Sequence, residues 1–216
     1  DQVVEEAGPF DFILADLGVS SMQIDNPDRG FTYKSEGPLD LRLNPEKGES
    51  AAERLKNATE DELEGMLVEN SDEPYAAEIA QLIMKKLRQG EMIDTTTKLY
   101  ETIEEALSFI PEKERKGAVK KSCQRTFQAL RIDVNSEFEV LYALMEKLPS
   151  ALKSGGKVAI LTFHSGEDRI VKKAFKEWKK AGVYSEIAND VIRPSAKECV
   201  RNSRAKSTKM RWAIKA

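Results

Sequence analysis

One segment limits the possible folds of this chain more than any other. It is the largely apolar run at residues 10–15, which is followed by Asp16, Leu17, Gly18 and two serines. A short apolar run bounded by polar turn residues is typical of a buried strand in a parallel sheet. Ligands of open α/β sheets bind outside the carboxyl ends of such strands. We therefore expect Asp16 at a ligand crevice, where Gly18 allows close backbone approach. The alternative is that Asp16 only caps a tight turn.

A second buried strand is predicted at residues 157–163, followed by a polar turn and an amphipathic helix. Residues 183–187 and 209–214 alternate enough to be edge strands. The resulting order is strand, helical block, long helix, strand, helix, strand, strand. This order predicts an α/β fold, the second half of a doubly wound domain with a helical block inserted after its first visible strand.

The segment between the two buried strands changes character along its length. Residues 19–48 are loop-like, and a loop this long is usually functional or disordered. Helices are predicted over residues 50–110, including one that starts with a capping box formed by Thr59 and Glu62. Residues 113–121 are interpreted as a basic linker, and a helical pattern resumes at about residue 122. We therefore assign residues 1–45 and 122–216 to the α/β domain and residues 46–121 to an inserted helical domain.

The net charge of −3 conceals an asymmetry along the chain. Residues 1–112 carry 10 Lys and Arg against 26 Asp and Glu, whereas residues 113–216 carry 24 against 11. An acidic half beside a basic half suggests a polyanionic partner for the basic half. The alternatives are that the halves mainly neutralise each other, or that the charges lie on solvated helix faces.

Composition also limits the cellular compartments in which we expect the protein. No run approaches the roughly 18 apolar residues of a membrane helix, and residues 1–8 lack the basic and apolar regions of a signal peptide. Cys123 and Cys199 are not spaced as a metal-ligand pair, and so few cysteines suggest a reducing compartment. We expect a soluble cytoplasmic protein that uses no metal.

Several sequence blocks carry a resemblance to a known family. They are residues 16–23 (Asp-Leu-Gly-Val-Ser-Ser, then Gln23), 28–31, 37–42 (Gly-Pro-Leu-Asp-Leu-Arg), 49–53, 125–135, 163–172 and 202–207, with Arg211. In this order they resemble the motifs of the MraW (RsmH) family, S-adenosylmethionine-dependent methyltransferases of small-subunit rRNA. Each block alone is a weak signal, but together they are highly specific.

The resemblance implies a Rossmann-like class I methyltransferase domain, present here as its C-terminal part, with an inserted α-helical domain. It implies methyl transfer to the N4 of a cytidine in the decoding region of 16S rRNA, with the small ribosomal subunit as partner. The family's glycine-rich cofactor loop and its ribose-binding acidic residue would lie upstream of Asp1. This chain alone is therefore expected to be a fragment that binds S-adenosylmethionine weakly and is inactive by itself.

Candidate catalytic residues are Asp16, Ser20 and Ser21, because an amine nucleophile needs a hydrogen-bond acceptor at the strand end. The resemblance implies cofactor contacts for Asp16 and Gln23, and we expect Gly18 to contact the cofactor as well. Two departures from the family pattern stand out. Gly166 replaces a usual leucine and should loosen the start of its helix, and Lys206 replaces a usual arginine, which keeps the charge but not bidentate geometry.

A further set of residues is predicted to contact RNA, each with a structural alternative. Phe31 could stack on a flipped base or anchor its loop in the core. His164 follows the second strand near the expected crevice, although a lone histidine is more often structural. The polar helical set could bind phosphate or lock the insert onto the core. The basic residues near the end could form an RNA-backbone patch or a solvated edge strand. These two groups are Arg125, Arg131 and Asn135, and Arg201, Arg204, Lys206 and Arg211.

Three functions compete at this point. The first is an rRNA cytidine N4-methyltransferase. The second is a non-catalytic RNA-binding or ribosome-assembly protein that keeps part of the fold, and the third is a methyltransferase of this fold with another substrate. The sequence leaves open whether two copies pair across an exposed sheet edge as a homodimer.

Overall fold

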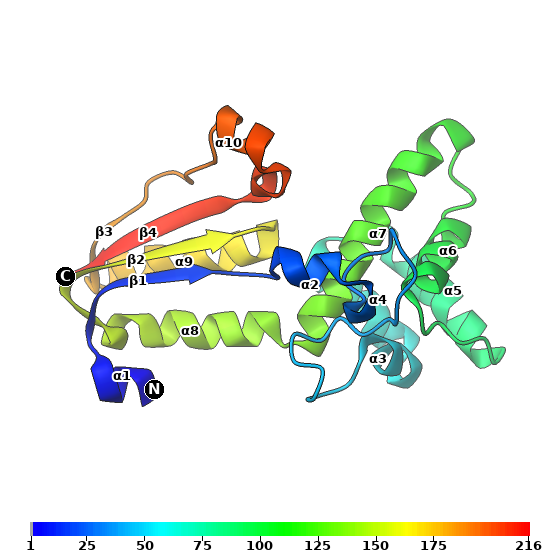
Figure 1. The fold of residues 1–216 in the computed structure, drawn as a ribbon, viewed down its shortest axis with the longest axis horizontal. Helices are drawn as coiled ribbons and strands as arrows, with labels where there is room; N and C mark the ends of the chain where they lie inside the picture. Colours follow the sequence, from blue (N-terminus) through cyan, green and yellow to red (C-terminus); the bar gives the residue numbers. More distant parts are fainter. Residues whose placement is uncertain (1) are drawn as a thin grey trace. The chain divides into compact units, whose positions relative to one another are not determined.

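The computed structural model describes residues 2–216, which form two compact units. The sheet unit comprises the residues up to Gly18 together with Phe138–Ala216, and the helical unit is Val19–Glu137. Figure 1 shows the strands in the first unit and a group of helices in the second. The α/β class predicted from the sequence is therefore confirmed.

The sheet unit is built on four strands in the order β1-β2-β4-β3. Strands β1 (Phe10–Asp16) and β2 (Leu152–Thr162) pair in parallel, which confirms that both predicted strands exist. The prediction that both are buried holds for the second half of β2 but is wrong for β1, which lies at the edge of the described sheet with Phe12 57% and Leu14 59% exposed. Strand β4 (Lys209–Lys215) is antiparallel to both β2 and β3 (Tyr184–Ile187). The prediction that both late strands lie at an edge is wrong for β4, which is internal. Alternating apolar and polar residues indicate that a strand has two different faces, but they do not indicate which strands pair with it.

Helices run alongside this sheet in Figure 1. The unit contains α1 (Gln2–Ala7), most of α8 (Glu137–Ala151), α9 (Ser165–Lys180), α10 (Ala196–Arg201) and the 3₁₀ turn η2 (Ser203–Ser207). Helix α9 contacts β2, β3 and β4. Its apolar stripe packs into a core that also includes side chains of α8 and the strands. The buried members of that core include Leu141, Met145, Leu148, Val158, Ile160, Ile170, Val171, Phe175, Tyr184 and Ala213.

The helical unit has its own core, formed by five helices and an ordered loop. Its elements are α2 (Ser21–Asp25), the 3₁₀ turn η1 (Pro27–Arg29), α3 (Ala51–Asn57), α4 (Glu60–Ser71), α5 (Ala76–Arg88), α6 (Thr96–Ala106) and α7 (Glu112–Val134). The predicted capping box of Thr59 and Glu62 is present at the start of α4. The helices expected before Gly90 and before Pro111 are also present.

Residues 113–121 are not a linker, because they form the first half of the continuous helix α7. Lysine and arginine are good helix formers, so a basic run is compatible with a solvated helix. The helical pattern predicted from residue 122 belongs to two helices, α7 and α8, separated at Ser136, whose φ is 48°. The compact helical unit also extends beyond the predicted insert of residues 46–121, since Leu39 and Leu41 are buried in its core and α7 continues to Val134. Among the described residues, no helix combines the length and the apolarity needed to cross a bilayer.

Candidate active site

The carboxyl ends of β1 and β2 form the candidate site in the sheet unit. Asp16 is in register with Leu161, and the Leu17 amide donates a hydrogen bond of 3.1 Å to the Leu161 carbonyl. Asp16 is exposed, and no described residue pairs with its carboxylate. The parallel sheet therefore presents a free carboxylate at the edge where α/β proteins bind ligands.

The backbone turns at Gly18, two residues beyond Asp16. Its φ of 86° lies in the left-handed region that favours glycine. A Cβ atom built there would lie 3.6 Å from the ring of Phe163, which is ordinary contact. The glycine is thus required for the turn rather than for the fit against Phe163.

His164 follows β2 at the same edge, and its side chain caps α9. Its Nδ1 accepts a hydrogen bond of 3.4 Å from the Glu167 amide. The Glu167 carboxylate accepts bonds from the Phe163 amide at 2.8 Å and the His164 amide at 3.4 Å. The two side chains are 10% and 4% exposed, and the His164 ring packs 5.9 Å from that of Phe138. This geometry favours the structural alternative for His164.

The same cap bears on Gly166, which the sequence predicts to loosen the helix start. Gly166 is buried, and a Cβ atom there would lie 2.7 Å from Cζ of Phe138. The capping box of His164 and Glu167 holds the first turn of α9. The glycine therefore makes room for an aromatic ring at a helix start that is fixed by other means.

The serines and the glutamine that follow Gly18 belong to the helical unit. Ser20 is the N-cap of α2 and accepts a bond from the Gln23 amide, while the Gln23 side-chain oxygen accepts one of 2.9 Å from the Ser20 amide. Ser21 is the first residue of the helix. Ser20 and Gln23 thus have a clear local role, and their predicted catalytic and cofactor roles, like that of Ser21, stay predictions.

The helical unit also holds four of the residues predicted to contact RNA. Phe31 packs against the core of this unit, and the Arg29 guanidinium lies 5.7 Å from its ring centre, which favours the anchoring alternative. Arg131 forms a bidentate ion pair with Glu137, at 2.7 and 3.0 Å. Arg125 is half-buried, and among the described residues it has no ion-pair partner.

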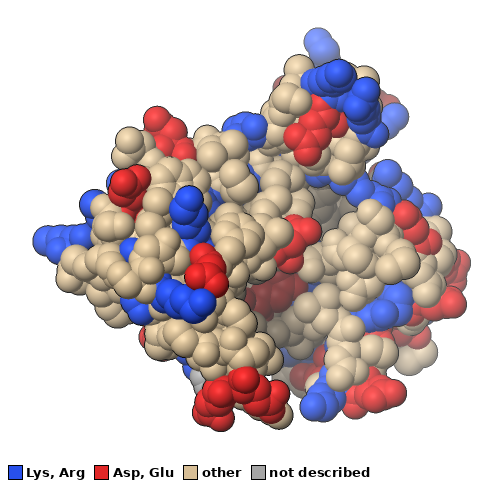
Figure 2. All heavy atoms as spheres, turned by 60° about the vertical axis from the view of Figure 1, so that its left-hand side comes forward, with Lys and Arg blue, Asp and Glu red and all other residues tan. Residues whose placement is uncertain are grey.

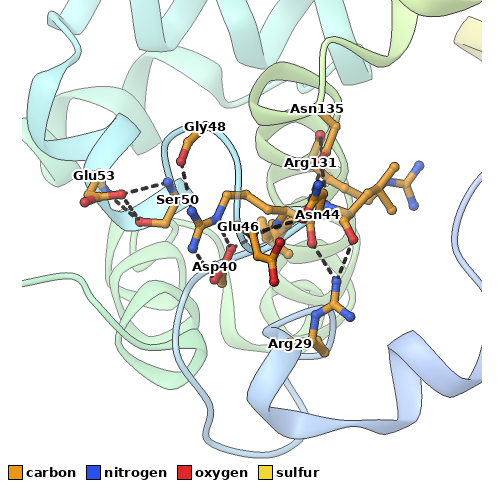
Figure 3. A network of polar contacts seen from close by, with 12 residues as sticks. Arg29, Asp40, Asn44, Glu46, Gly48, Ser50, Glu53, Arg131 and Asn135 are labelled. Carbon is orange, nitrogen blue, oxygen red and sulfur yellow. Dashed lines mark hydrogen bonds and ion pairs between the residues drawn. The ribbon is translucent and has the colours of Figure 1, made fainter.

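Asn135 belongs to a network of polar contacts that involves the loop of residues 39–50 (Figure 3). Its side-chain oxygen accepts a bond of 2.7 Å from the Leu43 amide, and its nitrogen donates to the carbonyls of Leu41 and Arg131, each at 2.8 Å. Leu41 is held at a φ of 63°, which is uncommon for a residue with a side chain. Asn135 therefore links the end of α7 to the loop at Leu41 and Leu43 within the helical unit.

Three charged residues complete this network, and none of them is among the site residues predicted from the sequence. Arg42 pairs with Asp40 through two bonds of 2.7 and 2.8 Å and also donates to the Gly48 carbonyl. Arg29 donates to the carbonyls of Arg42 and Leu43, both at 2.9 Å. The hydrogen bond from Arg42 lowers the pKa of Asp40, against the opposing effect of burial. The signal was present, since all three lie in the blocks 28–31 and 37–42 that carry the family resemblance.

Arg211 does not belong to an exposed basic patch, contrary to the prediction. It is 7% exposed and donates to both oxygens of Asp168 on α9, at 2.7 and 3.3 Å. Burial alone would raise the pKa of Asp168, but the hydrogen bond and charge of Arg211, with Lys209 and Lys172, hold it below its usual range. Because β4 is internal, its alternate residues point into packed surroundings, and the pair joins β4 to α9.

Three other basic residues of that group do remain on the surface. Arg201, Arg204 and Lys206 are exposed in the long connection between β3 and β4. This connection carries six basic residues and one acidic residue over residues 193–209. On the face shown in Figure 2, Lys and Arg side chains gather in several clusters with Asp and Glu between them.

Comparison with known proteins identifies the family. A model described as the MraW methylase family matches residues 1–216. The chain is 69% identical over all its 216 residues to ribosomal RNA small subunit methyltransferase H 1 of Lachnoclostridium phytofermentans, of which it covers 59%. It is 67% identical to the protein of the same name from Agathobacter rectalis and 62% identical to methyltransferase H 2 of Alkaliphilus metalliredigens, covering 62% of each. The chain thus spans about three fifths of the length of these relatives, and it belongs to the MraW methylase family.

Proposed function

We propose that the whole protein methylates the N4 amine of a cytidine in the decoding region of 16S rRNA, with S-adenosylmethionine as methyl donor. The observation that carries the proposal is the free carboxylate of Asp16 at the carboxyl edge of the parallel strands, in a chain of the MraW methylase family. The relatives' names, which specify small-subunit rRNA methylation, support the choice of substrate. An enzyme with this substrate acts where ribosomes are assembled, so we place it in the cytoplasm.

The chemistry explains why a carboxylate is needed at this position. The lone pair of an exocyclic amine on a pyrimidine is delocalised into the ring, so the nitrogen is a poor nucleophile. Asp16 can accept a hydrogen bond from this amine and hold its nitrogen in line for attack. Orientation of this kind can lower a barrier by several kcal/mol, up to about 10.

The residues at this edge also fit the proposed methyl donor. When bound, S-adenosylmethionine supplies a methyl group on a positively charged sulfonium. An exposed, unpaired carboxylate such as Asp16 suits a cationic ligand, and the left-handed turn at Gly18 keeps the neighbouring backbone free of a side chain. We propose Asp16, Gly18 and Gln23 as contacts to the donor, and Ser20 and Ser21 as further contacts at the reacting end.

We propose that four basic residues with exposed or half-exposed side chains contact the RNA. These are Arg125, Arg201, Arg204 and Lys206. Phosphate contacts by such residues position the substrate and carry no sequence information. Arg131, Asn135 and Arg211 are engaged in bonds within the protein, and Phe31 and His164 are packed, so we assign these five to the structure instead.

The test uses the whole protein in a strain that lacks its gene. We expect the wild-type gene to restore one methylated cytidine in 16S rRNA, located by mass spectrometry, and Asp16→Asn to leave it unmodified. Asp11→Asn is the matched control, because Asp11 lies on the same strand, is 84% exposed and forms only an exposed ion pair with Lys153. Normal methylation with Asp16→Asn, or equal loss with both variants, would remove Asp16 from the proposed site.

A further inference from the structure

Helix α9 has an outer face that is almost entirely cationic. Between positions 169 and 180 it carries six basic residues and one exposed acidic residue, Glu177. The apolar side chains Ile170, Val171 and Phe175 are buried in the sheet unit, so the basic side chains point outward. Four of them define what we call the α9 lysine face: Lys172, Lys173, Lys176 and Lys180. All four are exposed.

The four ammonium groups have no carboxylate partner within 4 Å among residues 2–216. Some basic residues on other helices do have a carboxylate partner. Lys86 lies 2.6 Å from Glu105, Arg88 lies 2.8 Å from Glu60, and Lys98 lies 2.7 Å from Asp94. These three positions are neutralised locally, whereas the α9 lysine face forms no ion pair within 4 Å among the described residues, although the charge of Lys172 helps to lower the pKa of Asp168. The exposed lysines of α7 also lack such a partner there, which makes them a matched comparison.

This arrangement has a cost for the isolated helix. Lys172 and Lys176, and Lys176 and Lys180, are four residues apart, while Lys173 and Lys176 are three apart. Like charges at these spacings are neighbours on a helix, and each pair destabilises it by about 0.2–0.5 kcal/mol. A polyanion bound along the face would relieve this repulsion and release its own counterions.

We propose that the α9 lysine face binds the phosphate backbone of the RNA that flanks the target base. Helix α9 starts directly after β2, at the carboxyl edge where Asp16 lies. At 1.5 Å per residue, Lys172 lies about 10 Å and Lys180 about 22 Å along the helix from its first residue. The face therefore follows a path that leads away from the candidate active site. The choice of RNA as the polyanion rests on the proposed function.

The test compares two fourfold variants of the whole protein. The first replaces Lys172, Lys173, Lys176 and Lys180 with glutamine, which keeps length and helix propensity. The matched control replaces Lys113, Lys116, Lys120 and Lys121 on α7, which are also four exposed helical lysines. Affinity for a fluorescent 16S rRNA transcript is measured by anisotropy from about 50 to 200 mM salt, and circular dichroism checks that both variants are folded.

We expect the α9 variant to bind at least tenfold more weakly and its salt slope to fall by about 3, as four lost phosphate contacts require. The α7 variant should change far less. Equal losses in both variants would mean that affinity follows net charge, and an unchanged α9 variant would mean that RNA binds elsewhere; either result overturns the proposal. A third result would also overturn the proposal. If polyglutamate of equal charge bound the wild type as tightly as RNA and lost its affinity with the same four substitutions, the face would suit an acidic protein instead.

The binding assay is independent of methyl transfer. A wild-type protein that bound the transcript but methylated no cytidine would contradict the proposed function. The comparison of the two variants would still decide whether α9 holds the RNA.

Discussion

At the scale of single residues, the pair of Arg211 and Asp168 shows how a charged motif residue can be structural. A buried pair is weak evidence for net stabilisation, but removal of one partner leaves the other charge buried without compensation. Arg211 is 7% exposed, so an unpaired guanidinium would remain out of water. The position is therefore sensitive to substitution without any contact to a substrate.

We expect Asp168→Asn to lower the free energy of unfolding by about 3 kcal/mol at pH 7. The pKa of Asp168 is lowered in the folded state, so its contribution is complete above its unfolded value and is lost as pH falls through the folded pKa. The difference between wild type and variant should be constant from pH 5 to 8 and shrink below about pH 4. Urea unfolding at several pH values measures it. A difference that did not change with pH would mean that the ion pair is not its source.

At the scale of the element, the start of α9 packs against Phe138 because Gly166 has no side chain. Alanine is normally favoured over glycine in a helix, by up to about 1 kcal/mol. Here the added Cβ would meet the ring of Phe138, so we expect Gly166→Ala to destabilise the protein by about 1–3 kcal/mol. In a Phe138→Leu background the same change should be neutral or stabilising. Thermal unfolding of the four proteins in this cycle is the measurement, and identical effects in both backgrounds would exclude the ring as the cause.

The side chain of Asn135 is one of several that hold the loop of residues 39–50, together with Arg29 and Arg42. Asn135→Ala would remove three hydrogen bonds, so we expect a loss of about 2 kcal/mol and faster hydrogen exchange at the Leu43 amide. Asn44→Ala is the control, because the Asn44 side chain accepts a hydrogen bond from the nearby Glu46 amide and has no other hydrogen-bond partner among residues 2–216. If exchange at Leu43 were equally fast in both variants, the loop would be held by other contacts of the network.

How far the sequence predicts this fold depends on the range of the interactions. The capping box of Thr59 and Glu62 is local and is predicted correctly, as are the parallel strands β1 and β2 from their apolar runs. The internal place of β4, the burial of Arg211 and the continuity of α7 depend on tertiary packing that no local pattern contains. At the candidate site, Asp16 could be placed at a strand end, but the internal partners of Asn135 and Arg131 could not be foreseen.

At the scale of the whole molecule, the two units differ in how they are encoded. The helical unit is one continuous stretch of the chain with its own core, whereas the sheet unit is assembled from two separate stretches. We expect residues 19–137 produced alone to fold cooperatively. Circular dichroism should give a helical spectrum and a sigmoidal thermal transition. A gradual, non-cooperative loss of signal would show that this unit needs the sheet unit.

Charge is also divided between the units. The helical unit carries 17 basic and 24 acidic residues. In the sheet unit, residues 138–216 carry 17 basic and 8 acidic residues, and residues 1–18 carry 5 acidic residues and no basic one. The asymmetry between the two halves of the sequence thus survives in the fold, although the lysines of α7 belong to the acidic unit. An RNA partner would be attracted mainly to the later part of the sheet unit, and this attraction should weaken as salt rises.

The internal position of β4 has a consequence for the order of events during synthesis. Strand β3 pairs only with β4 in the described sheet, so it waits unpaired until residues 209–215 have left the ribosome. Strand β1 pairs with β2 across more than a hundred intervening residues. The contiguous helical unit can collapse in that interval, because domains generally fold as units and the N-terminal parts come first. Once the helical unit has folded, the loop that must close between β1 and β2 is effectively shorter. We therefore expect early folding of the helical unit to lower the entropy cost of pairing β1 with β2.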